Sequence, residues 1–435
     1  MTDTEAPHHG PNGSHNQDEN LAQLPPPATR HSGKPWAPLV YPMYRIFWIA
    51  GLFSNMGTWM HETGAQWLMT SLHPSPEMVS AVRVSMTIPV FLLALPAGVW
   101  ADRFNRRTWL LSTQFLLLSI ATLMAVLARF DLITPSLLLI LTAAMGTAMI
   151  LNQPAWQALT PELVPPALVP SAVAVGSISF NLARSIGPAV GGLLIAYFNV
   201  WTTFAFNAVS FLGVIMVLLM WQPTPEPKSN RASPEFMTEL KKGMFVIKNT
   251  PPLRNALLRV LMFTLSASIL WSLLPLVATE KLGFRERGFG ICLGLIGAGA
   301  VVGAWFLPYV RSRFSSESLL LASNCIYASV CITIGLTHSA AWIMPGLFVI
   351  GACWMATMTT LNATAQVNLP RKFRARGMSA FLMSFALGMG LGSACWGWFA
   401  LGTSLGLTFI VAGVTLIATA FAVHSKKIGS LTVSH

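Results

Sequence analysis

Long apolar runs recur along most of this sequence, and they limit the folds open to it more than any other feature. A helix needs about 20 mostly apolar residues to cross the hydrocarbon layer of a bilayer. Its backbone must satisfy its own hydrogen bonds there, so a spanning segment is a helix or part of a closed β-barrel. Barrel strands alternate apolar and polar positions, which these runs do not. We therefore predict an all-α membrane protein with twelve spans, over residues 44–70, 77–101, 108–130, 134–158, 168–196, 201–221, 254–279, 288–310, 317–337, 341–365, 374–399 and 402–424.

The composition and the placement of charge agree with this prediction. Of 435 residues, 54% are hydrophobic and 10% are charged, whereas soluble domains carry about 25% charged residues. Lys and Arg gather in alternate connections, on the side of both termini, and few lie on the other side: Arg129, Lys281, Arg285 and Arg287. The positive-inside rule then places both termini in the cytoplasm. The same distribution accounts for the net charge of +12 without a nucleic-acid partner, which would need a basic patch on one folded face.

The chain divides into two halves at its longest polar connection. Residues 1–40 are polar and rich in Pro, His and Gly, and they are predicted to form a disordered cytoplasmic tail. We expect an N-terminal six-helix bundle over 41–221, a C-terminal one over 253–424, and a short cytoplasmic tail over 425–435. The linker 222–252 is expected to carry an amphipathic helix at the membrane surface, or else a plain linker helix.

Two pairs of matching segments relate the halves to each other. The segment Gly187–Gly192 in the fifth span aligns with Gly392–Gly397 in the eleventh. Upstream, Leu151-Asn152 in the fourth span matches Leu361-Asn362 in the tenth. Duplicated six-helix halves are typical of carriers that bind a substrate near the midplane and alternate access to it. We therefore predict a small-molecule carrier.

The connection between the second and third spans reads Gly98-Val99-Trp100-Ala101-Asp102-Arg103-Phe104-Asn105-Arg106-Arg107. It resembles the loop signature of the major facilitator superfamily, G-x-x-x-D-[RK]-x-G-[RK]-[RK], with Asn105 in place of the second Gly. Gly and Asn both tolerate left-handed backbone conformations, so the turn is still feasible. The resemblance implies the major facilitator fold of two pseudo-symmetric six-helix bundles. It also implies a cytoplasmic gate, with close helix packing at Gly98 and polar contacts of Asp102, Arg103, Arg106 and Arg107; the alternative is an ordinary basic loop.

The fifth span contains Ala183-Arg184-Ser185-Ile186-Gly187-Pro188-Ala189-Val190-Gly191-Gly192. It resembles the antiporter motif of the same superfamily, G-x-x-x-G-P-x-x-G-G, with Ala183 in place of the first Gly. Small residues permit tight helix packing and Pro188 permits a bend, and the alternative is generic small-residue packing. In that superfamily the motif marks exporters more than importers, which favours export.

The chain also resembles one branch of the superfamily over about residues 40–424. From Gly57-Thr58-Trp59-Met60 to Arg106-Arg107 it is similar to the transmembrane secretion effector group, which includes enterobactin-exporter-like proteins and relatives of macrolide efflux pumps. The resemblance implies a bacterial inner-membrane exporter of a bulky amphiphilic molecule, siderophore- or drug-like. An importer or lysolipid flippase of the same fold, and a non-transporting accessory of a secretion system, are the alternatives. The fourth span has no Arg where many proton antiporters of the superfamily carry one, so proton antiport needs another site.

Three charged residues inside the predicted spans are functional candidates: Glu62, Arg83 and Arg184. A charge at the bilayer centre costs about 2.5–3.5 kcal/mol on insertion scales. A buried ion needs a partner, and Glu62 can pair with either Arg83 or Arg184. Glu62 is then a protonatable coupling site or a contact for a cationic substrate group, and the alternative is a structural ion pair that locks helix packing.

Polar and aromatic residues within the spans are candidates for the wall of a substrate cavity. Aromatic, weakly polar walls suit bulky amphiphilic solutes rather than small sugars, and Trp also anchors helices at membrane interfaces. The candidates are Asn55, Trp59, Trp67, Asn152, Gln153, Trp156, Asn181, Trp271 and Asn362. The sequence has no Walker loop, no His/Cys/Asp cluster and no nucleophile motif, so we predict no enzyme activity, metal or cofactor. The expected partners are a small-molecule substrate and the lipid bilayer, and the expected state is a monomer.

Overall fold

The computed structural model describes residues 36–222, 249–367 and 374–424, and this part of the chain is helical. Residues 1–35 and 425–435 of the predicted tails, and most of the linker with its predicted amphipathic helix, lie outside the described residues. The prediction of disorder is wrong for the last residues of the N-terminal tail, because Ala37–Val40 form a helical turn whose Ala37 and Pro38 are buried. Twelve long helices form the described part: α1 (Pro42–Leu72), α2 (Pro76–Arg103), α3 (Arg106–Arg129), α4 (Pro135–Leu163), α5 (Val169–Phe198), α6 (Trp201–Met220), α8 (Pro251–Leu276), α9 (Glu286–Arg313), α10 (Ser316–Leu336), α11 (Ala340–Val367), α12 (Arg374–Gly402) and α13 (Leu405–His424). Short helical turns add η3 (Ala37–Val40), η4 (Pro166–Leu168) and the π-helical η5 (Val277–Lys281), which continues α8.

The long helices coincide with the twelve predicted spans. Eleven of them, α1 being the exception, are long and apolar enough to cross a membrane. The helix α1 is long enough, with 31 residues, but it carries Arg45, His61 and Glu62, which lower its hydropathy. Large apolar side chains are exposed on the outside of the helices, such as Trp305 at 81% and Trp398 at 75%. Apolar exposure on this scale fits lipid rather than water as the surrounding medium.

Local sequence signals set where the helices begin. Proline occupies one of the first two positions of α1, α2, α4, α5 and α8, where its missing N–H costs nothing. Asn105, Thr134 and Ser315 cap α3, α4 and α10 by accepting a hydrogen bond from the backbone N–H three residues on. Most connections between the described helices are only a few residues long, so successive helices run antiparallel. The beginning of α1 and the end of α13 therefore lie on the same side, here called the terminal face.

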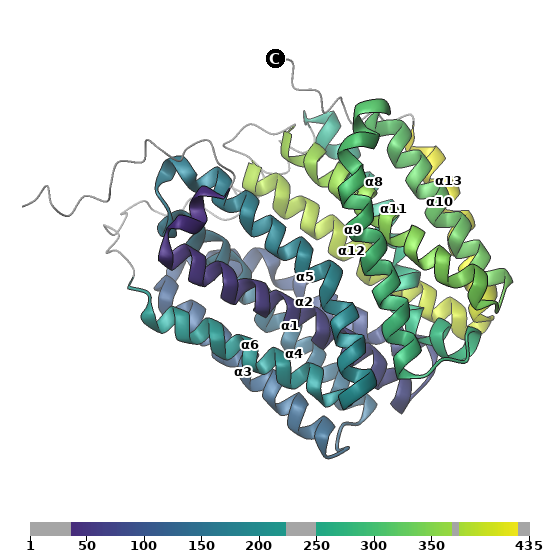
Figure 1. Ribbon diagram of the computed structural model, residues 1–435, viewed down its shortest axis with the longest axis horizontal. Helices are drawn as coiled ribbons and strands as arrows, with labels where there is room; N and C mark the ends of the chain where they lie inside the picture. The colour runs from purple at the N-terminus through teal and green to yellow at the C-terminus, as the bar shows by residue number, and fades with distance from the viewer. Residues whose placement is uncertain (1–35, 223–248, 368–373, 425–435) are drawn as a thin grey trace, which may run out of the picture.

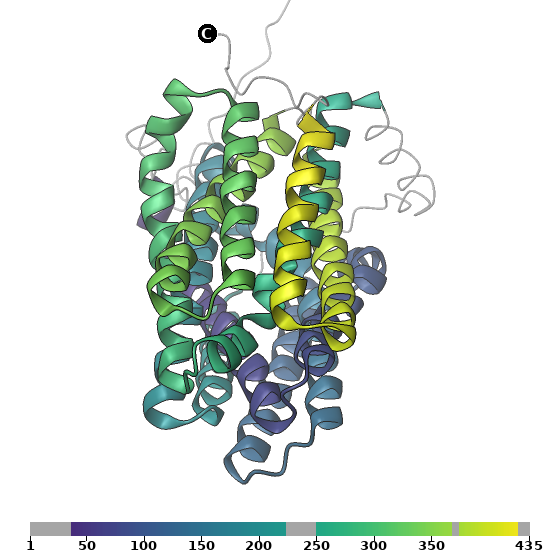
Figure 2. The same cartoon turned by 90° about the vertical axis from the view of Figure 1, so that its right-hand side faces the viewer.

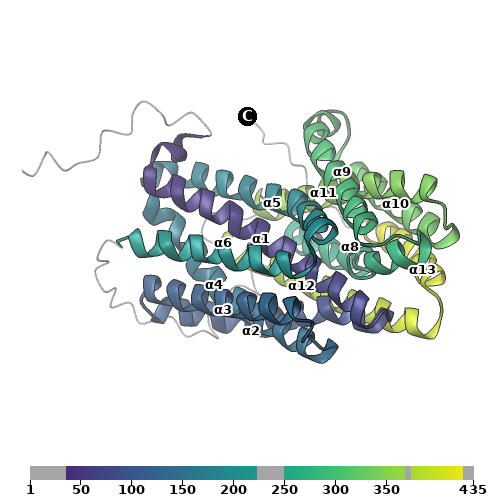
Figure 3. The same ribbon diagram turned by 60° about the horizontal axis from the view of Figure 1, so that its bottom comes forward.

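The helices form two six-helix bundles that lie side by side (Figure 1). In the N-terminal bundle α1 packs on α5 and α6, α2 on α4, and α3 on α6. In the C-terminal bundle α8 packs on α12 and α13, α9 on α11, and α10 on α13. These are the same pairings under the internal repeat, with α8 in the place of α1. The bundles meet mainly where α5 packs on α9 and α12 packs on α2 (Figures 2 and 3).

The two junctions between the bundles are equivalent under the sequence repeat. Gly192 of α5 lies against Gly290 of α9, where a Cβ on Gly290 would be 2.8 Å from the carbonyl carbon of Gly192. Its repeat partner, Gly397 of α12, lies against Ser80 of α2, where an added Cβ would be 2.7 Å from the Ser80 Cβ. Gly290 and Ser80 each lie one turn into their own helix. The aligned sequence segments thus become pseudo-symmetric contacts in space.

The bundles touch at the face opposite the termini and separate toward the terminal face. Along α12 and α2, the tight contact at Gly397 gives way to a looser one at Gly390, whose added Cβ would be 3.3 Å from the Thr87 Cβ. Along α5 and α9, a Cβ on Gly294 would be 4.0 Å from the Ala189 Cβ. Nearer the terminal face, Cβ atoms on Gly98 of α2 and Gly176 of α5 would meet no described heavy atom within 4 Å. The paired helices therefore diverge in the direction of the termini.

Candidate functional site

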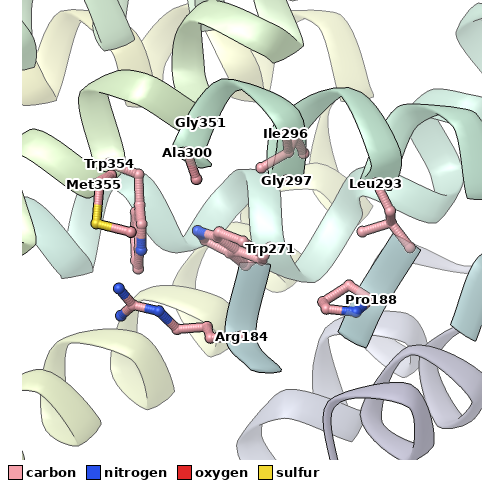
Figure 4. A pocket seen from close by; sticks show the side chains of 10 residues that line it. All are labelled: Arg184, Pro188, Trp271, Leu293, Ile296, Gly297, Ala300, Gly351, Trp354 and Met355. Carbon is pink, nitrogen blue, oxygen red and sulfur yellow. The ribbon is translucent and has the colours of Figure 1, made fainter. Parts of the chain in front are cut away.

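A pocket lies between the two bundles where α5 and α9 begin to diverge (Figure 4). It is a narrow recess, and the space among its lining side chains reaches about 380 Å³ only when the adjoining open solvent is counted. Arg184 and Pro188 of α5 form one wall, and residues of α8, α9 and α11 form the others. Arg184 lies halfway along α5, so the pocket is near the middle of the helices. The ten lining residues are Arg184, Pro188, Trp271, Leu293, Ile296, Gly297, Ala300, Gly351, Trp354 and Met355.

The polar side-chain groups of the pocket are the guanidinium of Arg184 and the indole nitrogens of Trp271 and Trp354. Arg184 is the only charged residue among the ten that line it. Its guanidinium and the indole nitrogen of Trp271 both lie on the side of Trp354 (Figure 4). The Trp271 Nε1 is buried and has no hydrogen-bond partner among the described residues. The rings of Trp271 and Trp354 meet edge to face, with centroids 5.1 Å apart.

An aromatic cluster in the C-terminal bundle holds Trp354 in place. Its ring lies 5.4 Å from that of Phe263 in α8 and 6.3 Å from that of Phe385 in α12, measured between centroids. Phe263 in turn packs edge to face on Tyr327 of α10, whose hydroxyl donates to the Ala267 carbonyl at 3.1 Å. The sequence prediction missed Trp354 and Met355, because an apolar position in a fully apolar span carries no sign of which face it occupies. Trp271, one of the candidates predicted from the sequence, lines the pocket.

The intramembrane carboxylate pairs with Arg83 rather than with Arg184. Glu62 of α1 and Arg83 of α2 form a salt bridge whose side chains are 13% and 11% exposed. Thr87, one turn further along α2, donates its hydroxyl proton to the Arg83 carbonyl. Arg184 instead points into the pocket between the bundles, and Glu62 is not among the residues that line it. The two alternatives left open by the sequence are thus resolved by which helices are neighbours.

The loop between α2 and α3 shows two basic contacts, both within the N-terminal bundle. Arg106 pairs with Glu162 near the end of α4 and lies within 3.4 Å of the Ala158 carbonyl oxygen. Arg107 donates to the carbonyls of Leu218 and Leu219, at 3.1 and 2.7 Å, at the end of α6. A cation there compensates the exposed carbonyls and the negative end of the helix dipole. The sequence prediction did not identify Glu162 as a partner.

The other predicted gate residues, Gly98, Asp102 and Arg103, show no such contacts among the described residues. Asp102 and Arg103 end α2, and their side chains lie outside the described residues. The close helix approach expected at Gly98 is absent from this conformation, because no described heavy atom lies within 4 Å of where its Cβ would be. The same empty space is found at Gly176 of α5, which also lies toward the terminal face.

The glycines of the α5 motif make the close contacts that small residues permit. A Cβ on Gly187 would lie 2.7 Å from the Trp59 Cβ, and one on Gly191 would lie 3.0 Å from the Met60 Cα, both in α1. Gly192 faces the other bundle, as described above. Pro188 lies between them on the pocket wall. The motif thus joins α5 to α1 on one side and to α9 on the other.

Three of the predicted cavity residues make packing contacts in the described structure and are not among the residues that line the pocket. Trp67 is buried at the junction of the bundles, stacked on Phe289 of α9 with ring centroids 5.0 Å apart. Asn152 is buried inside the N-terminal bundle, where its amide donates to the Thr113 hydroxyl at 2.8 Å. Trp156 packs edge to face on Phe47 within the same bundle. Each side chain has a specific packing or hydrogen-bond partner on a neighbouring helix, and the periodicity of the sequence does not reveal which partner that is.

The remaining candidates are spread over other surfaces. Trp59 packs on Gly187 and meets the ring of Phe180 edge to face at 6.3 Å. Asn55 and Asn362 are half-buried, Gln153 is exposed, and none of the three is among the pocket residues. The Asn181 side chain lies outside the described residues. Among the described residues there is no group of three or more His, Cys, Asp or Glu side chains that would hold a metal ion.

Comparisons with known proteins agree with the fold. The sequence model of the transmembrane secretion effector family matches residues 33–433. The chain is 23% identical to the staphyloferrin A transporter of Staphylococcus aureus, over 78% of this chain and 85% of that one. It is 21% identical to macrolide efflux protein A of Enterococcus faecalis, over 59% and 81% of the two chains. The crystal structure of the nucleoside transporter NupG superposes with a TM-score of 0.71 at 12% identity, over 88% and 99% of the chains, which shows a common fold.

Proposed function

Because the chain belongs to the transmembrane secretion effector family of major facilitator transporters, which are not enzymes, we propose that it is a secondary active exporter of a bulky amphiphilic molecule. It works as a monomer in a bacterial inner membrane, with both termini in the cytoplasm. The observation that carries this proposal is the pocket between two bundles that touch at one face and diverge toward the other. A substrate bound there exchanges sides when the bundles rock about it.

The described conformation corresponds to the cytoplasm-facing state in this proposal. The excess of Lys and Arg on the side of the termini supports a cytoplasmic terminal face. The bundles diverge toward that face, so the pocket takes up its substrate from the cytoplasm. Rocking about the pocket then separates Gly192 from Gly290 and Gly397 from Ser80, and it brings the cytoplasmic ends of the helices together.

Export is favoured by two independent kinds of support. The α5 segment keeps three of the four glycines and the proline of a motif typical of exporters. The matching family is described as a secretion effector family, and one relative is named as a macrolide efflux protein. The staphyloferrin A transporter, another relative, extends the range of substrates from drug-like to siderophore-like molecules.

We place proton coupling at Glu62. Its carboxylate is largely removed from solvent and its negative charge is compensated by Arg83. A proton taken up by Glu62 neutralises the carboxylate and releases Arg83 from the pair. Arg83 is one turn from Thr87, which faces Gly390 of α12 in the other bundle. Protonation thus acts next to a junction that must open during transport.

The test compares the medium of a deletion strain with that of strains complemented by the wild-type gene or by Glu62→Gln. Metabolite profiling identifies a compound that appears in the medium only with the wild-type gene. Transport of that compound by the purified protein is then measured in proteoliposomes in which an imposed pH gradient is the driving force. Glu286→Gln is the control, because Glu286 is exposed at the start of α9. We expect Glu62→Gln to lose proton-driven transport while exchange of the compound across the membrane persists.

Two results would overturn parts of this proposal. Unchanged proton-driven transport by Glu62→Gln removes the coupling role of Glu62. Failure of the purified protein to move the compound in either direction indicates an accessory of a secretion system instead of a carrier, and movement only into the cell indicates an importer.

A further inference from the structure

We propose that the pocket at Arg184 is an anion site, and that the transported molecule carries a carboxylate, sulfonate or phosphate group next to an aromatic or apolar body. The inference rests on the proposed function, since it names the substrate class of the same pocket. It differs from the expectation, drawn from Glu62, that the substrate has a cationic group.

The hydrogen-bonding groups that line the pocket are donors. Arg184 offers five N–H donors in a planar fork and no acceptor, and the Trp271 indole offers one donor and no acceptor. The other lining side chains are apolar, apart from the Trp354 indole and the weakly accepting thioether of Met355. A ligand that matches this lining must therefore supply acceptor oxygens. The Arg fork fits the two oxygens of a carboxylate, sulfonate or phosphate in a bidentate manner.

The charge of the pocket points the same way. A guanidinium halfway along a membrane helix is costly to bury, so a function that requires it there is the natural explanation. None of the ten lining residues carries a carboxylate. A cationic ligand would face Arg184 with like charge, whereas an anionic ligand gains an attraction strengthened by the apolar surroundings.

The aromatic walls define the rest of the ligand. Trp271 and Trp354 meet edge to face next to the guanidinium, and Leu293, Ile296 and Met355 extend the apolar surface (Figure 4). Such walls bind an aromatic or aliphatic body by burial and ring contacts. The anionic group then lies at Arg184 and the Trp271 Nε1, and the body lies along the indole rings.

A pair of fluorescent probes that differ in one group tests the proposal. 1-Anilinonaphthalene-8-sulfonate is anionic, and N-phenyl-1-naphthylamine is the same scaffold without the sulfonate. Each is titrated into the full chain in nanodiscs of zwitterionic lipid, and the signal of empty nanodiscs is subtracted. We expect the wild type to bind the anionic probe at least about tenfold more tightly than the neutral one, because a charge-assisted bidentate contact is among the strongest polar interactions.

Variants of the pocket residues test whether the preference for the anionic probe arises at Arg184 and Trp271. Arg184→Met is expected to weaken the anionic probe at least about tenfold and to leave the neutral probe unchanged. Arg184→Lys keeps the charge but loses the fork, so we expect an intermediate affinity for the anion. Trp271→Phe keeps a ring but loses the donor, and we expect a loss of a few-fold for the anion alone. Arg129→Gln is the control, since it removes an exposed positive charge that lies over the Trp201 ring, away from the pocket.

The outcomes separate this inference from the transport proposal. Two results overturn the anion site. One is equal affinity of the wild type for the two probes, and the other is an Arg184→Met variant that binds the anionic probe as tightly as the wild type does. Nanodiscs with phosphatidylglycerol distinguish the source of the anion: competition seen in the wild type and lost in Arg184→Met identifies lipid headgroups as ligands of the site. Since binding needs neither direction nor proton coupling, charge selectivity survives if the protein proves to be an importer, and export of a neutral compound contradicts only the present inference.

Discussion

Replacing Gly192 with Ala tests whether the contact at the opposite face holds the described conformation. A Cβ on Gly192 would lie 3.2 Å from the backbone N of Gly290, and it would lie closer still to the Gly290 Cα. The obstacle is backbone, which cannot rotate away as a flexible side chain would. The two helices must therefore move apart at the point where the bundles are in closest contact.

The size of the effect follows from the cost of overpacking. Inserting a methyl group into a fully packed site costs about 1–3 kcal/mol. The cost applies only to the conformation in which Gly192 and Gly290 touch, so the equilibrium shifts about 5- to 150-fold toward the conformation in which they are apart. Ala also has a higher helix propensity than Gly, by up to about 1 kcal/mol. That gain is the same in both conformations, because α5 is helical in each, and it cancels.

The shift is measured as a distance across the opposite face. Spin labels are attached at His73 and Arg285, which are exposed in the connections before α2 and α9, after the five native cysteines have been replaced. We expect Gly192→Ala to enrich the longer distances between the two labels, measured by pulsed electron–electron double resonance. Gly213→Ala in α6 is the matched control, because a Cβ there meets no described heavy atom within 4 Å. If Gly192→Ala and Gly213→Ala give the same distance distribution as the parent protein, the contact does not control the equilibrium and the reasoning fails.

Two further perturbations follow from the contacts. Glu317→Gln removes the carboxylate that lies 2.5 Å from Arg259, a guanidinium only 6% exposed, so it should cost about 3 kcal/mol and lower the thermal unfolding temperature clearly. Glu162→Gln removes a more solvent-accessible pair and should cost less than about 1 kcal/mol; the reverse order in thermal unfolding of the purified variants contradicts this ranking. Trp67→Ala removes the stack on Phe289 between the bundles, worth about 0.5–1.5 kcal/mol beyond its buried area, and should enrich the open opposite face about two- to tenfold in the distance measurement. An unchanged distribution would show that the stack forms with equal strength in both conformations.

The helices and their order were predictable because they depend on local properties of the chain. Apolar length determines a span and proline or a capping side chain determines where it begins, so the predicted and observed boundaries agree to within a few residues. The recurrence of Gly192 as Gly397 could also be interpreted from the sequence, because a residue without a side chain is needed where two helices touch. Such features depend on one segment or on the kind of residue, and not on the rotation of a helix about its axis.

The site depended on the rotation of each helix about its axis, which the sequence leaves open in a span that is apolar on every side. Trp67, Trp156 and Trp271 were equivalent candidates, yet only Trp271 faces the pocket. The choice of Arg83 over Arg184 as the partner of Glu62 likewise follows from α1 and α2 being neighbours there. Tertiary neighbours decide these assignments, and the hydrophobic periodicity that normally reports them is weak when lipid and protein core are equally apolar.

The surroundings of Gly98 depend on the conformation of the protein. The sequence predicts a close helix approach at this glycine, and the described conformation leaves it without a neighbour within 4 Å in the described part of the chain. At the other end of the same helix, Ser80 is in tight contact with Gly397. If the N-terminal bundle rocks against the C-terminal one, α2 cannot make both contacts at once, since closing one end of the helix separates the other. In the alternating-access proposal, the contact expected at Gly98 belongs to the state in which the junction at Gly397 is open. The sequence then encodes the contacts of two conformations, and a single conformation satisfies one set of them.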